Sequence, residues 1–477
     1  MNLKTKVIHG LTWSFTSQVG TVGSQFIITV ILARLLSPSD FGLLGMITVF
    51  TGFATIFNDM GISGALIQKQ DTDEKHLSSA FWLNIIIGVI LTLLMMAASP
   101  LIARFYDVPQ LEPLIIGMSL NYFIASFTIV QQAILTKDMD FKRLAARDIV
   151  AVIAGGLVGI TLAYRGFGVW SLVYQSITFT LMNVILLWTV SPWRPKFIFS
   201  KEAILDIFKF SANLTGFSIV NFFGRNVDYL LIGKFLGAEA LGFYTLAYKL
   251  MMVPLQNISW VISRVMFPAY SKIQNNLIKL GDTYLKTVKA VSLVTFPMMF
   301  ILFVVAPEFV VFIFGPQWEP TVIIIRVLCI CGAMQSIGVL SSTIYQSLNE
   351  TRTQFRLQLA ATLIVTVAVI AGLNFGIKGV ALFYTLQYLI WFNINYFVVL
   401  KLLNLKLRNL YANLKTAFTI NAILILILFL IKSLLILSQF FVLSSIAVIA
   451  TAVYLALLII AKEIVFENNK IMLRFLR

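Results

Sequence analysis

The chain has 477 residues, of which 59% are hydrophobic and 12% are charged, and its mean hydropathy is +0.92. These values exclude a soluble globular protein and indicate an integral membrane protein. The 36 Lys and Arg residues outnumber the 20 Asp and Glu residues, giving a formal net charge of +16, but the bases are spread among the connections between apolar stretches. A nucleic-acid-binding surface is therefore excluded.

Fourteen stretches of the sequence are long and apolar enough to cross a bilayer, whose core of about 30 Å requires about 20 mostly apolar residues per helix. In chain order they cover residues 11–33, 41–66, 80–98, 113–135, 148–164, 168–189, 210–236, 241–263, 290–314, 321–346, 357–374, 379–400, 414–432 and 439–461. The predicted fold is all-α, a polytopic membrane protein with about 14 transmembrane helices.

The basic residues predict the topology. With the N-terminus in the cytoplasm and alternating spans, 27 of the 36 Lys and Arg residues fall in cytoplasmic segments. This asymmetry predicts that both termini are cytoplasmic. Outward connections such as 37–40 and 237–240 are then too short to hold a soluble domain. The first stretch is predicted to be a permanent helix, because it is too long for a cleaved signal and lacks a small-x-small cleavage site.

Two local features lie near the ends of the predicted spans. The longest inward connection, 264–289, carries apolar and aromatic residues at three- and four-residue spacing, which predicts an amphipathic helix on the inner surface. These residues are Tyr270, Ile273, Leu277, Leu280 and Tyr284. Glu308 and Arg326, near the outward ends of neighbouring spans, are expected to form a stabilising pair.

Residues that carry catalytic chemistry are scarce. The two His residues, His9 and His76, lie near span ends, and Cys329 and Cys331 point in different directions on one predicted helix. Gly233 and Lys234 lack the first glycine and the Ser or Thr of a phosphate-binding loop. The sequence therefore predicts no metal site, no cofactor and no enzymatic activity.

A repeat links the two halves of the chain. Residues 31–42 (ILARLLSPSDFG) return 200 residues later as residues 231–242 (LIGKFLGAEALG), with two apolar residues, a small residue, a base, a turn containing an acid, and Gly in the same order. Membrane proteins built from two similar halves usually move a substrate between them. The predicted parts are an N-terminal lobe (1–200), a C-terminal lobe (201–403), and two extra helices with a cytoplasmic tail (404–477).

Polar residues follow one face of the first stretch in each half. They are Gln18, Thr21, Gln25 and Thr29 in the first half, and Ser218, Asn221, Arg225 and Tyr229 at the 200-residue offset. Residues three and four apart share a helix face. Two such stripes predict a shared water-filled cavity, because polar groups on spanning helices rarely face lipid.

Ionisable residues within the spans are the main candidates for function. From the turn at 237–240, Arg225 lies about 16 Å deep and Lys249 about 13 Å deep. A charge at the centre of a spanning helix costs at least about 2.5–3.5 kcal/mol, so it needs a partner. In a structural interpretation, Arg225 pairs with Asp228, and Lys249 extends to the membrane interface or pairs with Asp59. In a functional interpretation the bases bind an anionic substrate, and the two interpretations are not exclusive. The predicted cavity residues are Gln18, Gln25, Asn221, Arg225, Tyr229 and Lys249, and Asp59 and Asp228 are candidates for coupling or gating.

Residues 35–42 (LLSPSDFG) and 57–69 (FNDMGISGALIQK), together with the fourteen spans, resemble the polysaccharide transporter (Wzx-type lipid-linked oligosaccharide flippase) family of the multidrug/oligosaccharidyl-lipid/polysaccharide (MOP) exporter superfamily. The resemblance implies two pseudo-symmetric six-helix lobes around a cavity, followed by two helices. It also implies flipping of a polyprenyl-diphosphate-linked oligosaccharide from the cytoplasmic to the outer leaflet of a bacterial inner membrane, for surface polysaccharide biosynthesis. Membrane lipids and other polysaccharide-assembly membrane proteins are the further partners implied.

Two other functions are weighed against this one. A cation-coupled drug antiporter of the same superfamily is expected to carry an acid in its first helix, and this chain has none between His9 and Ala33. A membrane polymerase or glycosyltransferase needs a sizeable outward loop with catalytic groups, which the short outward connections do not provide.

Overall fold

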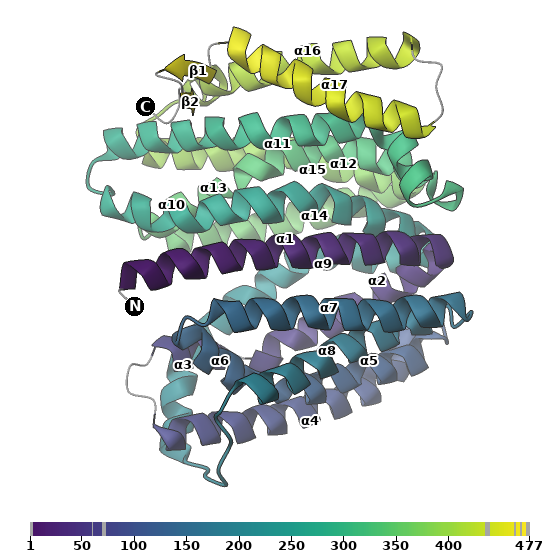
Figure 1. The fold of residues 1–477 in the computed structure, drawn as a ribbon, viewed down its shortest axis with the longest axis vertical. Coiled ribbons are helices and arrows are strands. Elements are labelled where there is room, and N and C mark those ends of the chain that lie inside the picture. Colours follow the sequence, from purple (N-terminus) through teal and green to yellow (C-terminus); the bar gives the residue numbers. More distant parts are fainter. Residues whose placement is uncertain are drawn as a thin grey trace. The chain divides into compact units, whose positions relative to one another are not determined.

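The computed structural model describes residues 3–59, 61–68, 73–434, 439–461, 464–467 and 470–473, and most of these residues are helical (Figure 1). The side chains of several stretches, including 3–17, 59 and 206–220, lie outside the description. Packing divides the chain into two units, Met1–Gly242 and Phe243–Arg477, which are described separately.

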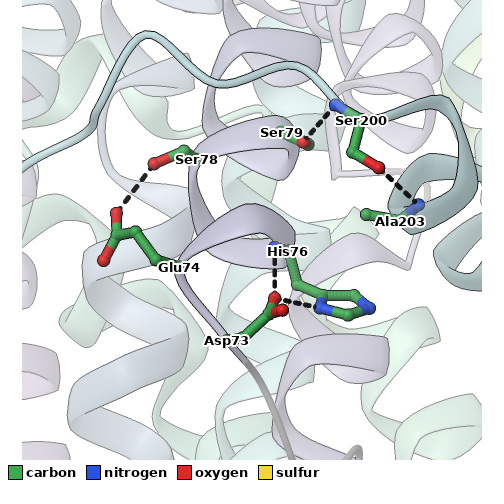
Figure 2. Close-up of polar contacts among 7 residues, drawn as sticks. All are labelled: Asp73, Glu74, His76, Ser78, Ser79, Ser200 and Ala203. Carbon is green, nitrogen blue, oxygen red and sulfur yellow. Dashed lines mark hydrogen bonds and ion pairs between the residues drawn. The ribbon is translucent and has the colours of Figure 1, made fainter.

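The first unit is built from helices joined by short turns. They are α1 (Leu3–Leu35), α2 (Pro38–Asp59), α3 (Ile62–Gln68), α4 (Glu74–Tyr106), α5 (Leu111–Ser126), α6 (Ile129–Lys137), α7 (Phe141–Tyr164), α8 (Trp170–Val190) and most of α9 (Lys201–Pro254). Helix α4 shows how the sequence sets these boundaries. The Asp73 carboxylate accepts a hydrogen bond from the His76 amide at 3.0 Å, which caps the first turn and holds the pKa of Asp73 below its usual value (Figure 2).

An aromatic cluster fills one end of the first unit. The Phe81 ring lies 5.5–6.0 Å, between centroids, from the rings of Trp82, Phe127, Trp188 and Trp193. Phe81 is almost fully buried. Aromatic pairs in such edge-to-face arrangements stabilise a core beyond their buried area. The cluster joins α4, α5, α8 and the segment that follows α8.

That segment, residues 191–200, connects the two predicted lobes and is fastened to α4. The backbone amide of Lys196 donates to Ser78 Oγ at 3.0 Å. The amide of Ser200 donates to Ser79 Oγ at 2.8 Å (Figure 2). Ser78 Oγ in turn donates to Glu74 at 2.8 Å. The connector is therefore bound to α4 of the first unit by hydrogen bonds at two positions.

Helix α9 is interrupted at Gly237, which has φ 84° and ψ 179°. This conformation is readily available only to glycine. A Cβ atom placed on Gly233 would lie 3.3 Å from Leu241, although eight residues of continuous helix would separate these positions by about 12 Å along the axis. The chain therefore reverses direction at Gly237, where the sequence predicts an outward turn.

The second unit continues from the end of α9. Its elements are a π-helical turn (Leu255–Ser259), α10 (Trp260–Lys272), α11 (Leu277–Ile313), a 3₁₀ turn (Pro316–Trp318), α12 (Thr321–Gly338), α13 (Leu340–Ser347), α14 (Thr351–Leu373), α15 (Gly376–Leu402), α16 (Leu407–Leu434), α17 (Gln439–Ile460), β1 (Ile464–Glu467) and β2 (Lys470–Leu473). Helices α16 and α17 pack on α11 through a buried cluster that includes Val304, Leu424 and Ala450. The antiparallel β1–β2 hairpin is a small exception to the predicted all-α fold.

The polytopic helical fold is confirmed, whereas the number of fourteen spans stays a prediction. In the described part of the chain, nine helices are long and apolar enough to cross a bilayer, or ten if α5 and α6, bent by 46°, form one span. One of these, Asn221–Lys272, has 52 residues, or about 78 Å of helix, and contains the break at Gly237. Because a bilayer core is about 30 Å thick, this run accounts for more than one crossing.

The predicted amphipathic helix over 264–289 is wrong. The segment contains the end of α10, a turn, and the start of α11, where Asn276 Oδ1 caps the helix by accepting from the Lys279 amide at 3.0 Å. Tyr270, Leu280 and Tyr284 are fully buried instead of lying on a membrane surface. The same periodicity arises whether an apolar face meets lipid or another helix.

The predicted pair between Glu308 and Arg326 is also wrong. Lys432 on α16 donates to Glu308 Oε2 at 2.8 Å and to the carbonyl oxygen of Val304 at 3.2 Å. Arg326 instead donates to the carbonyl of Phe303 at 3.2 Å. Glu308 therefore fastens the C-terminal helix α16 to α11, a contact between residues 124 positions apart.

Candidate functional site

The two glutamines of the predicted polar face of α1 are accessible. The side chains of Gln18 and Gln25 are both exposed. On its other sides α1 packs closely on α7: a Cβ atom on Gly20 would lie 2.9 Å from Ile149, and one on Gly156 of α7 would lie 2.2 Å from Ile28. Glycines thus bring the apolar sides of the two helices together, while the two glutamines remain exposed.

Helix α9 is held against α2 by aromatic residues next to its polar stripe. The rings of Phe222 and Phe223 lie 6.0 and 5.2 Å from that of Phe53. Asn221, one residue before this pair, is partly exposed, and Arg225 is exposed. The aromatic contacts fix the rotation of α9 about its axis and hence the direction in which the Arg225 side chain leaves the helix.

Asp228 has a different environment from Arg225, although the two residues are three apart. Its side chain is 2% exposed, and its Oδ1 accepts the backbone amide of Tyr229 at 3.0 Å. Tyr229 itself is partly exposed. A buried carboxylate needs donors of this kind, because an unsatisfied charge within a spanning segment is costly.

Lys249 lies on the part of α9 that belongs to the second unit. Its side chain is exposed, and no hydrogen bond or ion pair joins its ammonium group to another residue in the described part of the chain. Arg225 and Lys249 are each twelve residues from the break at Gly237, or about 18 Å of helix. Both residues therefore lie slightly further from the turn than the distances of about 16 Å and about 13 Å expected from the sequence.

The structure thus describes all six predicted cavity residues but does not test their roles. Asp59 is the last residue of α2, and its side chain lies outside the described residues. Gln18, Gln25, Asn221, Arg225 and Tyr229 belong to the first unit, and Lys249 belongs to the second. Among the residues whose placement is described, no group of three His, Cys, Asp or Glu side chains could hold a metal ion.

One ion pair that sequence analysis missed lies beside the break in α9 at Gly237. Lys234 Nζ donates to Asp107 Oδ2 at 2.6 Å and lies 5.5 Å from the centre of the Phe105 ring. Asp107 terminates α4 in a left-handed conformation. No spacing in the sequence relates Lys234 to Asp107, because the two residues are 127 positions apart.

Solved structures of membrane transporters share this fold. Lipid II flippase MurJ, in an inward closed conformation, superposes with a TM-score of 0.76, covering 95% of this chain and 99% of MurJ at 16% identity. An inward-facing multidrug resistance MATE family transporter of the MOP superfamily gives a TM-score of 0.66 over 80% of this chain and 94% of its own. The chain thus has the same polytopic helical fold as these two transporters.

The sequence comparisons define the family more narrowly. Lipopolysaccharide biosynthesis protein WzxC of Escherichia coli is 29% identical over 84% of this chain and 82% of its own length. Teichuronic acid biosynthesis protein TuaB of Bacillus subtilis is 32% identical over 70% of each chain. Residues 31–323 match the family described as polysaccharide biosynthesis protein, and the chain belongs to that family. The predicted family is therefore confirmed. The predicted class of protein is confirmed as well: a multi-pass membrane transport protein of polysaccharide biosynthesis, and not an enzyme.

Proposed function

We propose that this protein flips a polyprenyl-diphosphate-linked oligosaccharide from the cytoplasmic to the outer leaflet of a bacterial inner membrane, for the assembly of a surface polysaccharide. The proposal is supported by the membership of the polysaccharide biosynthesis family and by the fold shared with a lipid II flippase. The observation that carries it is the exposed side chain of Arg225 within a predicted spanning segment.

The diphosphate is the part of such a substrate that cannot cross hydrocarbon unaided. An Arg fork binds phosphate oxygens through two parallel hydrogen bonds, and Lys adds a point charge. Arg225 and the exposed Lys249 supply this countercharge. Binding the anion offsets the cost of keeping each cation within the membrane, which is at least about 2.5–3.5 kcal/mol.

The sugar part of the substrate requires hydrogen-bond donors and acceptors instead of charge. Gln18, Gln25 and Asn221 have amide groups that donate and accept, and the Tyr229 hydroxyl does both. All four side chains are at least partly exposed. The two halves of the chain alternately open to each side, while the polyprenyl tail stays in the bilayer among membrane lipids.

The two acids have a separate role in this proposal. Buried Asp228 is a candidate coupling or gating group, because protonation would remove a charge that a single helix turn separates from Arg225. Asp59 is the second candidate. Both termini are cytoplasmic in this scheme, which places the basic segments on the side where the substrate is loaded.

The test is export of the surface polysaccharide, combined with analysis of the lipid-linked intermediate that accumulates in cells lacking the protein. Arg225→Ala is expected to abolish export, and Arg225→Lys to retain part of it. Arg143→Ala is the matched control, because the Arg143 side chain is 56% exposed and pairs with Asp140 at the start of α7. Membrane levels of all variants are compared by immunoblot. Full export by Arg225→Ala would contradict the assignment.

A double variant separates substrate binding from internal pairing. If Arg225 mainly neutralises Asp228, changing both residues to Ala should restore export, because no uncompensated charge remains. If Arg225 binds the diphosphate, the double variant should reach the membrane and still fail to export. We expect the second outcome.

A further inference from the structure

The two copies of the repeat lie against each other in the first unit. A Cβ atom placed on Gly42, in the first turns of α2, would lie 1.6 Å from the carbonyl oxygen of Ala238. A Cβ atom on Gly242 would lie 1.9 Å from the carbonyl oxygen of Pro38. Real Cβ atoms essentially never approach another heavy atom closer than 3.0 Å. Both positions therefore require glycine, since backbone occupies the space that a side chain needs.

These contacts are reciprocal. Gly242 is the repeat counterpart of Gly42, and Ala238 is the counterpart of Pro38, each at an offset of 200 residues. Position 42 of one copy thus meets position 38 of the other, and the same is true with the copies exchanged. The contact has the local two-fold symmetry of the repeat, which is the arrangement expected where two related halves meet.

The first copy presents a rigid surface at this contact. Ser37 and Asp40 form a capping box: Ser37 Oγ donates to Asp40 Oδ2 at 2.7 Å, and the Ser37 amide donates to the same oxygen at 2.9 Å. In the second copy, the turn at Gly237 orients the carbonyl of Ala238. The backbones that meet are therefore fixed by their own local structure and not by each other.

The contact between the copies is also separable. No backbone N–H···O hydrogen bond joins Gly42, Ala238, Pro38 and Gly242; each glycine Cα lies against a carbonyl oxygen of the other copy, a weak contact of the Cα–H···O kind. Each pair of packed heavy atoms contributes only about 0.1–0.2 kcal/mol. Separating these four residues therefore breaks no strong directional hydrogen bond between the two copies.

We propose that the reciprocal contact of Gly42 with Ala238 and of Gly242 with Pro38 is the outer seal of the transport pathway. It closes the outward end between the two halves while substrate is loaded, and it opens for release. The inference rests on the proposed alternating access and on the predicted outward position of residues 37–40 and 238–240. Glycine at both positions is then required for closure rather than for folding of either half.

The experiment measures the seal directly, without substrate. Spin labels are placed at Ser39→Cys and Glu239→Cys, which are repeat counterparts beside the contact, and their distance distribution is recorded in purified protein in lipid nanodiscs. The native Cys329 and Cys331 are fully buried and provide little background. The parent is expected to show a short-distance population that represents the closed seal.

Gly42→Ala and Gly242→Ala are each expected to abolish that population. To reach a separation of 3.0 Å, the carbonyl oxygens must retreat by at least about 1.4 Å and 1.1 Å respectively. Gly23→Ala is the matched control, because a Cβ atom there would meet nothing within 4 Å, and it should leave the distances unchanged. Gly155→Ala is a second control, because its Cβ atom would lie 2.8 Å from the carbonyl oxygen of Gln175, at a tight helix contact outside the seal. It shows how far a tight contact elsewhere changes the measured distances.

Three results would overturn the inference: retention of the short distance in both alanine variants, an effect of only one of them, or loss of folded protein from the membrane in both. The last result would make the contact a permanent part of the fold. The measured distances do not depend on the substrate. If the proposed substrate is wrong, the spin-label distances still test the seal. If the proposed seal is wrong, the effect of Arg225→Ala on export is still expected.

Discussion

Ser78 is predicted to be the residue that secures the connector between the two halves. Its side chain is fully buried, and its hydroxyl donates to Glu74 at 2.8 Å (Figure 2). The same hydroxyl accepts from the Lys196 amide at 3.0 Å. Ser78→Ala removes one neutral hydrogen bond, worth about 1 kcal/mol, and one to a carboxylate, worth about 1.5–3 kcal/mol. Glu74 keeps the Trp193 indole as a donor at 3.3 Å, which places the expected total near 2–3 kcal/mol.

The measurement is the free energy of unfolding in mixed micelles, obtained by titration with a denaturing detergent. Ser433→Ala is the matched control, because Ser433 is exposed and donates only to the carbonyl of Leu430 within its own helix. The control should lie within about 0.5 kcal/mol of the parent. If Ser78→Ala also stays within about 0.5 kcal/mol, the connector is not fastened by this hydroxyl, and the inference drawn from the hydrogen bonds fails.

Two further predictions concern topology and the C-terminal helices. An impermeant maleimide added to intact cells should label Ser39→Cys but not Lys201→Cys, because the basic residues put residues 37–40 outside and 201 inside; equal labelling of both would refute the fourteen-span topology. Lys432→Ala should destabilise the protein by about 3 kcal/mol, because it leaves the Glu308 carboxylate without its cation. Adding Glu308→Gln should recover much of that loss in the same unfolding assay, and an equal or larger loss in the double variant would argue against the pair.

The repeat shows how far local sequence can be interpreted. The shared order of residues in 31–42 and 231–242 predicts two related halves, and Gly237 lies where an outward turn is expected. The sequence assigns no reason for Gly42 and Gly242 beyond a shared turn. Their role follows only from the carbonyl oxygens of Ala238 and Pro38, which come from the opposite copy. When a glycine is required because a backbone segment distant in sequence packs against it, the residues beside it in the sequence show no pattern that indicates the contact.

The candidate site was predictable to a similar degree. A polar stripe is a property of one helix, and the structure keeps Gln18, Gln25 and Arg225 exposed on theirs. The difference between Arg225 and Asp228 was not predictable, because both lie on the same helix with similar polarity. Burial of Asp228 depends on what packs against that side of α9, which sequence spacing does not encode.

The sequence by itself determined the class of molecule: a multi-pass helical membrane protein with an internal repeat and few residues suited to catalysis. These properties depend on hydrophobicity summed over about 20 residues and on helical periodicity, both of which are local. Only the tertiary structure decided which residues are partners, including Glu308 with Lys432 instead of Arg326, and burial of Tyr270 and Tyr284 instead of contact with a membrane surface. The physical reason is that hydrogen bonds and ion pairs act over about 3 Å between side chains, and residues more than a hundred positions apart reach that separation only after the helices have packed.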